Sequence, residues 1–164
     1  MTEEALTYND VLLVPQYSEI KSRSEVSLTS MLGSLEFELP IIASPMDTIS
    51  ESSMASTMGE HGGLSIIHRY NTIERQATIV RSVVTTIPSP IVGAAIGTSG
   101  DYLERATALV GAGAQVLCVD VAHGHHILMR TALDELKEAF GDSVHIMAGN
   151  IATLEGYNDL VDWG

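Results

Sequence analysis

The segment from Gln115 to His126, QVLCVDVAHGHH, changes in one step from an apolar run to a carboxylate and a small, His-rich stretch. Residues 116–119 are typical of a buried parallel strand, and Asp120 follows directly. In α/β folds, ligand sites lie at the carboxyl edge of the sheet. Asp120 is therefore a candidate acceptor of hydrogen bonds from ligand hydroxyls. The alternative is that Asp120 caps a loop or the next helix.

Two other residue types in this segment could carry chemistry. His123, His125 and His126 invite a zinc interpretation, but a third ligand on the same face is needed and the cluster stands where a helix begins. We therefore predict no metal site. Cys118 lies inside the apolar run without an activating base, which predicts a buried structural thiol and not a nucleophile.

The elements that would position these groups repeat regularly. Apolar strands are predicted to start near residues 39, 63, 91, 116 and 144, about the spacing of βαβ units, and helical patterns lie between them. Each strand is followed by polar side chains: Ser44, His68, Thr98 with Ser99, Asp120 with His123, and Asn150. Residues 1–38 precede the first unit and are predicted to form an irregular N-terminal arm.

Several local signals predict where the helices begin and what they bury. Ser50 or Ser52 is expected to cap the first helix. Asn71, with Glu74 three residues on, has the spacing of a capping box. Thr153 is expected to cap the last helix, and Leu128 is expected on the buried face of the preceding one.

Alternating strands and helices imply a parallel sheet with right-handed crossovers. Two architectures fit: an open, five-stranded doubly wound sheet, or the first five units of a (β/α)8 barrel. Because such a barrel typically needs about 250 residues, the pattern alone slightly favours the open sheet. The first strand, however, is followed by Ser44-Pro45-Met46 and not by a glycine-rich phosphate loop, which weakens a nucleotide-binding open sheet.

Composition bounds the class of protein. At 164 residues, with 45% hydrophobic and 18% charged residues, the chain is predicted to be one globular domain. The net charge of −13 argues against nucleic acid or an anionic membrane as partner. No apolar run approaches ~18 residues, and the acidic start MTEEALTYND lacks the features of a signal peptide. With a single cysteine, a reducing cytoplasm is the expected location.

Six segments, in order and at matching spacing, resemble the IMP dehydrogenase/GMP reductase family. They are TYNDVLLVPQYS (7–18), PIIASPMDTIS (40–50), GGLSIIHR (62–69), VGAAIG (92–97), AGAQVLCVDVAHGH (112–125) and IMAGNIAT (146–153). The resemblance implies a (β/α)8 TIM barrel, here its first five β/α units over residues 39–164. It also implies an NAD(P)-dependent oxidoreductase acting at C2 of a purine nucleoside monophosphate, in a family whose barrels form homo-tetramers.

The resemblance also assigns residues. Ser44 and Met46 match positions that line the nucleotide pocket, and Asn150 matches an Asn near the reacting base. Asp120 matches the carboxylate that contacts the nicotinamide ribose. The remaining cofactor-binding matches are His68, on the adenosine side, and the loop formed by Ala122, His123 and Gly124.

The family mechanism is covalent catalysis by a cysteine thiolate. That cysteine follows the family's sixth strand and would lie beyond Gly164, so no catalytic residue is expected within this chain; a monovalent-cation site, possible by resemblance, is not expected here either. The family's regulatory CBS insert is absent, because residues 81–90 join the second helix directly to the third strand.

Two branches and one other class of function remain open. KSRSEV (21–26) resembles GMP reductases, which use NADPH, whereas GNIAT (149–153) resembles IMP dehydrogenases, which use NAD; the balance leans to the dehydrogenase, converting IMP to XMP. The alternative of another class is a non-catalytic fragment that binds nucleotide or docks onto a full-length subunit. In either case a complementary C-terminal half is a candidate partner.

Overall fold

The computed structural model describes residue 4 and residues 6–164, and its centre is a parallel sheet of five strands. The strands are β3 (Ile42–Ala43), β4 (Leu64–Ile67), β5 (Ile91–Ile96), β6 (Val116–Asp120) and β7 (His145–Gly149). Their spatial order is β3-β4-β5-β6-β7, the same as their order in the chain. A doubly wound sheet reverses its order at a switch point, so the slight preference for the open sheet is wrong.

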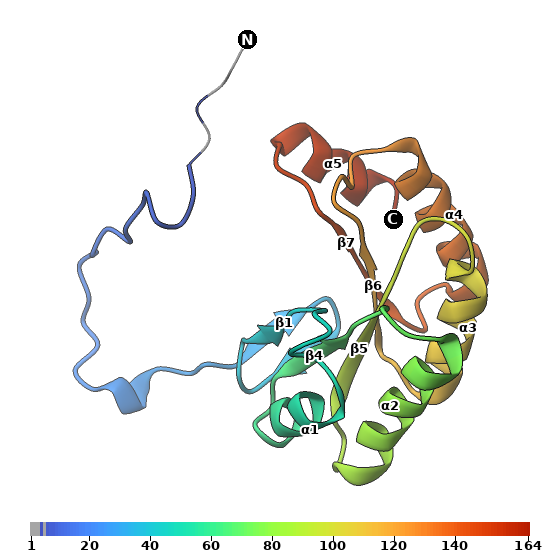
Figure 1. The fold of residues 1–164 in the computed structure, drawn as a ribbon. Helices are drawn as coiled ribbons and strands as arrows, with labels where there is room; N and C mark the ends of the chain where they lie inside the picture. The colour runs from blue at the N-terminus through green and yellow to red at the C-terminus, as the bar shows by residue number, and fades with distance from the viewer. Residues whose placement is uncertain (1–3, 5) are drawn as a thin grey trace.

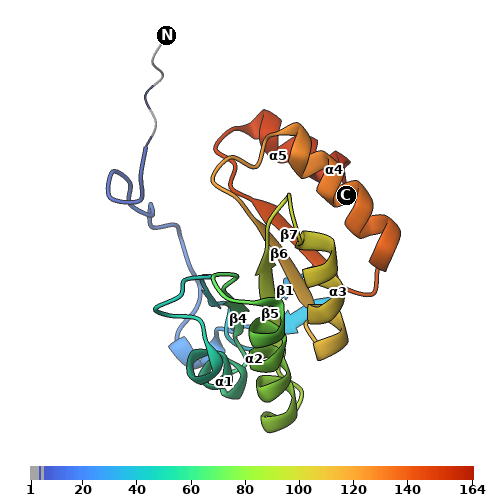
Figure 2. The same ribbon diagram turned by 45° about the vertical axis from the view of Figure 1, so that its right-hand side comes forward.

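Five helices alternate with these strands. They are α1 (Ser52–Glu60), α2 (Ile73–Thr86), α3 (Tyr102–Ala112), α4 (Ile127–Phe140) and α5 (Leu154–Asp162). The sheet curls, and the helices lie along its outer side (Figures 1 and 2). The result is a half-barrel: sequential parallel strands inside and helices outside.

Side chains alternate between the two faces of the sheet and form two cores. On β4, β5 and β6 the convex side carries Ile67, Val92, Ala94, Ile96, Leu117 and Val119, which pack against the helices. The concave side carries Leu64, Ile66, Ala95, Val116 and Cys118. Gly93 also belongs to this inner side, where a Cβ would lie 2.4 Å from Cδ1 of Ile66, so close packing of β4 on β5 requires a glycine.

The N-terminal region is more regular than predicted. Strands β1 (Ser30–Leu32) and β2 (Leu35–Phe37) form an antiparallel hairpin, and Phe37 at its end is buried in the inner core. The hairpin turns at Gly33, whose φ of 58° favours glycine. Before the hairpin, residues 6–29 contain only a short 3-10 turn, η1 (Arg23–Glu25), and extend away from the body in both views (Figures 1 and 2).

The helix starts follow the predictions in part. Thr153 caps α5 by accepting the N–H of Gly156, as predicted, but Thr72 and not Asn71 caps α2. The N-cap of α1 is Glu51, which makes no side-chain cap bond, while the Ser50 hydroxyl donates to the carbonyl of Ser44.

The face that α4 buries also differs from the prediction. Leu128 is 48% exposed, whereas Met129 is fully buried. The helix begins at Ile127, with His126 as its N-cap, and its buried residues are Met129, Ala132, Leu133 and Leu136. Leu128 lies to one side of this buried stripe, because adjacent helical residues are rotated by about 100° from each other.

Within the part of the chain that the structure describes, every helix is too short or too polar to span a bilayer.

Candidate active site

A cavity of about 550 Å³ lies at the carboxyl edge of the half-barrel. Its lining residues are Ser44, Pro45, Met46, Asp47, Tyr70, Asp120 and Asn150. They come from the segments after β3, β4 and β7 and from the last residue of β6. Four of them (Ser44, Met46, Asp120 and Asn150) are residues that the sequence singled out, so the fold brings together side chains up to about a hundred positions apart.

The pairing of β6 with β7 positions the two central polar groups. Asp120 stands opposite Gly149 in the register. The backbone hydrogen bonding continues for one residue past the end of each strand. The N–H of Asn150 donates to the carbonyl of Val121 at 2.7 Å, and the N–H of Val121 donates to the carbonyl of Gly149 at 3.0 Å. These backbone bonds hold the Asp120 carboxylate and the Asn150 amide on neighbouring strands at one rim.

The loop after Asp120 is anchored by a close approach at Gly124. Its N–H donates to the carbonyl oxygen of Asn150 at 2.7 Å. A Cβ at Gly124 would lie 2.9 Å from that oxygen and 3.0 Å from the carbonyl carbon of Gly149. A larger residue would therefore push this loop away from the segment that carries Asn150.

His68 is placed differently from the other predicted residues. It is 3% exposed, and its Nδ1 accepts the N–H of Tyr70 at 3.2 Å. The ring proton therefore belongs on Nε2, which lies 3.2 Å from a carboxylate oxygen of Glu51. His68 connects the end of β4 to α1 and does not line the cavity, so direct contact with a cofactor stays a prediction.

The other residues that the sequence singled out do not line the cavity. Ala122 and His123 are exposed on the loop between Asp120 and α4, and Thr98 and Ser99 follow β5. Nε2 of His125 instead lies at hydrogen-bond distance, 2.8 Å, from a carboxylate oxygen of Asp159 on α5. Among residue 4 and residues 6–164, no group of three His, Cys, Asp or Glu side chains is arranged to hold a metal ion.

Sequence reasoning missed three lining residues: Pro45, Asp47 and Tyr70. Pro45 and Asp47 belong to the same Ser-Pro-Met-Asp turn as two predicted residues, so that whole turn could have been assigned. Tyr70 carries a weaker signal, an aromatic residue three positions after the end of a strand, which any loop can contain.

The charges of the cavity restrict what it can bind. It presents two carboxylates, a hydroxyl, an amide, a thioether and an aromatic ring, and neither Lys nor Arg lines it among the described residues. Carboxylates accept hydrogen bonds from hydroxyl groups but repel phosphate. The cavity therefore suits sugar hydroxyls and a planar base better than a phosphate group.

Cys118 lies below Asp120 on β6 and faces the inner core. It is 9% exposed. Burial, and next the negative charge of Asp120, raise the pKa of its thiol to about 12. The thiol is thus protonated near neutral pH and is a structural side chain, as the sequence predicted.

We expect Cys118 to resist alkylation in the folded chain. Only the thiolate is nucleophilic, and both burial and the raised pKa keep its concentration low. Iodoacetamide at pH 8 should label the native chain far more slowly than the chain in 6 M guanidinium. Equal labelling rates in the two states would show that Cys118 is exposed and ionisable.

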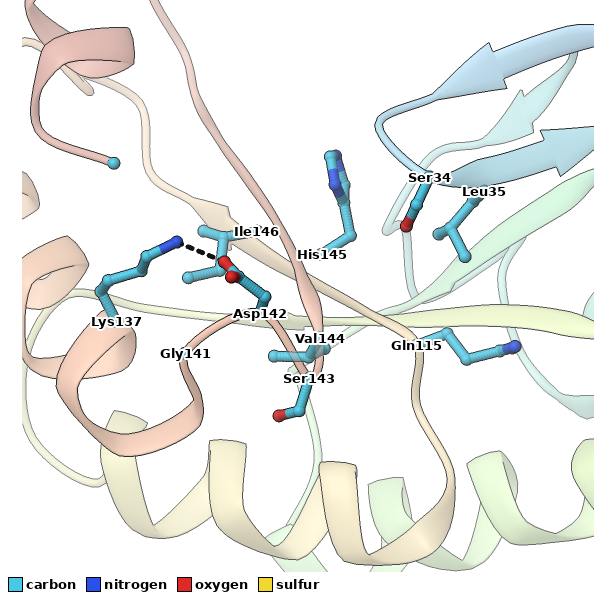
Figure 3. A pocket seen from close by; sticks show the side chains of 11 residues that line it. Ser34, Leu35, Gln115, Lys137, Gly141, Asp142, Ser143, Val144, His145 and Ile146 are labelled. Atoms are coloured by element: carbon cyan, nitrogen blue, oxygen red, sulfur yellow. Dashed lines mark hydrogen bonds and ion pairs between the residues drawn. The ribbon is translucent and has the colours of Figure 1, made fainter.

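A second cavity, of about 580 Å³, lies at the opposite end of β6 and β7, beside the hairpin (Figure 3). Three of its polar side chains contact other parts of the chain. Lys137 pairs with Asp142 at 2.7 Å, and the ring of His145 packs so closely on the hairpin turn that a Cβ at Gly33 would lie 2.7 Å from its Nδ1. This cavity sits where the hairpin rests on the half-barrel and lies away from the carboxyl edge.

Comparison with known proteins agrees with this arrangement. The model of the IMP dehydrogenase / GMP reductase domain matches residues 5–164. An inosine-5'-monophosphate dehydrogenase of Nitrosopumilus maritimus is 28% identical, with 99% of this chain and 60% of that protein covered. A GMP reductase of Leishmania major is 27% identical over 98% of this chain and 60% of its own length.

A third relative, an inosine-5'-monophosphate dehydrogenase of Cryptosporidium parvum, is 32% identical, with 98% of this chain and 50% of that protein covered. The chain thus spans about half to three-fifths of the length of these relatives. Since the family model covers nearly every residue, this chain belongs to the IMP dehydrogenase/GMP reductase domain family.

Proposed function

We propose that these 164 residues supply the nucleotide- and cofactor-binding wall of an NAD(P)-dependent oxidoreductase acting on a purine nucleoside monophosphate. The observation that carries the proposal is the convergence of Ser44, Met46, Asp120 and Asn150 on one cavity at the carboxyl edge. In barrels built from β/α units, this edge is where active sites lie. The half-barrel is accordingly proposed to be the first five units of a (β/α)8 barrel, with residues 1–38 as its N-terminal arm.

Each residue has a proposed role. Asp120 accepts hydrogen bonds from both hydroxyls of the nicotinamide ribose, which a carboxylate with two oxygens can do. Ser44 and Met46 flank the purine nucleotide, and Asn150 contacts the reacting base. Ala122, His123 and Gly124 form the neighbouring cofactor loop.

The residues that line the cavity fit a nicotinamide cofactor. Asp120 and Asp47 are acceptors for sugar hydroxyls, and Met46 and Tyr70 offer apolar and aromatic surface to a flat ring. When bound, NAD or NADPH accepts or delivers the hydride. This chain's own residues bind and orient it. The phosphates must be held by other parts of the protein, because the lining residues carry no positive charge.

The dehydrogenase direction, IMP to XMP with NAD, is the main proposal. The alternative is GMP reductase, converting GMP to IMP with NADPH, and similar relatives carry both names. A non-catalytic fragment that binds nucleotide or docks on a full-length subunit is the alternative of another class. Assay with IMP and NAD, and separately with GMP and NADPH, of this chain supplied with a complementary C-terminal half distinguishes the three.

Asp120→Ala is expected to weaken binding of nicotinamide mononucleotide by about 5- to 150-fold, since losing a charged hydrogen-bond partner costs roughly 1–3 kcal/mol. Titration calorimetry on the 164-residue chain measures this loss. Asp134→Ala, at an exposed position of α4, is the control and should leave the affinity unchanged. Unchanged affinity for Asp120→Ala together with a much lower Tm would show that Asp120 is only a structural cap.

A further inference from the structure

Among residue 4 and residues 6–164, Tyr70 is the one aromatic side chain that lines the carboxyl-edge cavity. It is 66% exposed, and it follows the end of β4 by three residues, on the same edge as Asp120. Large aromatic residues usually bury most of their surface, because each carries a large apolar area. The open tyrosine ring at the rim of this cavity therefore offers apolar aromatic surface to a ligand.

His68 holds Tyr70 in place through two contacts. The backbone N–H of Tyr70 donates to Nδ1 of His68 at 3.2 Å. The two rings stack, with centroids 6.1 Å apart and planes inclined by 22°. His68 is itself fixed, because it is buried and its Nε2 contacts the Glu51 carboxylate. This chain of contacts orients the tyrosine ring before any ligand arrives.

The guanidinium of Arg69 adds a second restraint. Its Cζ lies 5.8 Å from the centroid of the Tyr70 ring, and one of its nitrogens donates to the carbonyl of Asp120 at 3.4 Å. Arg69 thus links the tyrosine to the strand end that carries the candidate ribose-binding carboxylate. Ring and carboxylate are connected through one side chain, which fixes their relative position at the cavity.

We propose that Tyr70 is the stacking surface on which this cavity holds a planar base, and so a further binding residue of the proposed nucleotide site. A ring fixed in advance loses little conformational entropy when a base stacks on it. The neighbouring carboxylates accept the sugar hydroxyls of the same ligand. The inference rests on the proposed function. The base is either the nicotinamide of the cofactor or the purine of the substrate, two flat rings with the same stacking chemistry.

The test compares ligands with and without a base. Nicotinamide mononucleotide, inosine 5'-monophosphate and ribose 5-phosphate are titrated calorimetrically into the unaltered 164-residue chain and into Tyr70→Leu and Tyr70→Phe. Leu keeps apolar volume without an aromatic face, and Phe keeps the face without the hydroxyl. Tyr157→Leu, at a 56% exposed tyrosine on α5, is the matched control.

Tyr70→Leu is expected to weaken one of the two base-bearing ligands by about 5- to 100-fold, the usual effect of losing one stacked base. Ribose 5-phosphate should be unaffected, and Tyr70→Phe should retain most of the affinity. The ligand that loses affinity identifies the stacked base as nicotinamide or purine.

Other results overturn the inference. An equal loss for all three ligands, or loss with Tyr70→Phe as large as with Tyr70→Leu, would mean that the aromatic face does not stack a base. Base-bearing ligands that bind Tyr70→Leu as tightly as the unaltered chain would assign the exposed ring to protein packing instead, with the proposed function intact. Failure of the unaltered chain to bind either base-bearing ligand would reject the nucleotide site itself, and the inference with it.

Discussion

Replacing Arg105 with Ala is expected to lower the free energy of unfolding by about 1–3 kcal/mol, the usual cost of leaving a buried polar group without its hydrogen-bond partner. Arg105 on α3 is 8% exposed. Its guanidinium donates to Oε1 of Gln76 at 2.8 Å, to the carbonyl of Asn71 at 3.2 Å, and to both carboxylate oxygens of Asp101. Removing it leaves the buried Gln76 oxygen without a partner.

Gln76 makes this network important for the site as well as for stability. Its fully buried side-chain amide donates to the carbonyls of Ile67 on β4 and Ala95 on β5. These bonds tie two strands together near their carboxyl ends, where the segment with Tyr70 begins. Loss of Arg105 should therefore loosen the cavity rim in addition to destabilising the fold.

Urea denaturation followed by circular dichroism measures the effect. The free energy of unfolding of Arg105→Lys should lie between those of the unaltered chain and Arg105→Ala, because an ammonium group cannot reproduce the planar fork of the guanidinium. Arg81→Ala, at an exposed position of α2, is the matched control and should change stability by less than about 0.5 kcal/mol. A loss for Arg105→Ala no larger than for Arg81→Ala would contradict the structural role of the network.

The loss should also depend on pH. Hydrogen bonds from Arg105 lower the pKa of the Asp101 carboxyl from its ordinary value of 3.8. A carboxyl whose pKa is lower in the folded state contributes stability above its unfolded pKa and loses it as the pH falls through the folded value. The difference in free energy of unfolding between the unaltered chain and Arg105→Ala should therefore be largest at pH 7 and should become smaller below about pH 3.8.

The 164-residue chain by itself is expected to self-associate and to show no turnover. Within the described residues, β3 and β7 each pair with one neighbour only, and an unpaired strand edge is a template for pairing with another chain. Ile42 on β3 is 42% exposed. Turnover is not expected, because Cys118, the only cysteine, is buried with a pKa of about 12.

Size-exclusion chromatography and NAD- or NADPH-linked absorbance with IMP and GMP test this expectation. Ile42→Lys should shift the chain toward the monomer, because a charge on an edge strand opposes pairing. Leu103→Lys, at an exposed position on α3 away from both edges, should not. A sharp monomer peak for the unaltered chain would refute the predicted self-association. Turnover above background would refute the predicted inactivity.

The sequence by itself determined the local elements and the centre of the site. Apolar runs separated by helical patterns predicted all five parallel strands, because a strand buried on both faces must be apolar throughout. The switch from Val119 to Asp120 predicted a carboxylate at the end of a strand, since a charge is not tolerated inside such a run. Family resemblance added Ser44, Met46 and Asn150, which the fold places on the same cavity as Asp120.

Only the tertiary structure decided which of these elements become neighbours. Periodicity does not encode strand order, so the pattern alone slightly favoured the open sheet, whereas the family resemblance implied a barrel. The pairing of β3 with β4 and of β4 with β5 decided for the curled sheet with sequential strand order. Residues 30–37 pair only with each other and dock on the inner core, which no local pattern records.

Side-chain environment was likewise outside the reach of the sequence. His68, Tyr70 and Arg105 are all polar residues near helix starts, and local patterns treat them alike. In the structure His68 is buried, Tyr70 is open to the cavity and Arg105 closes a network between two helices and two strands. His68 contacts Glu51 and Arg105 contacts Gln76, partners at least seventeen residues away, and long-range packing alone brings them together.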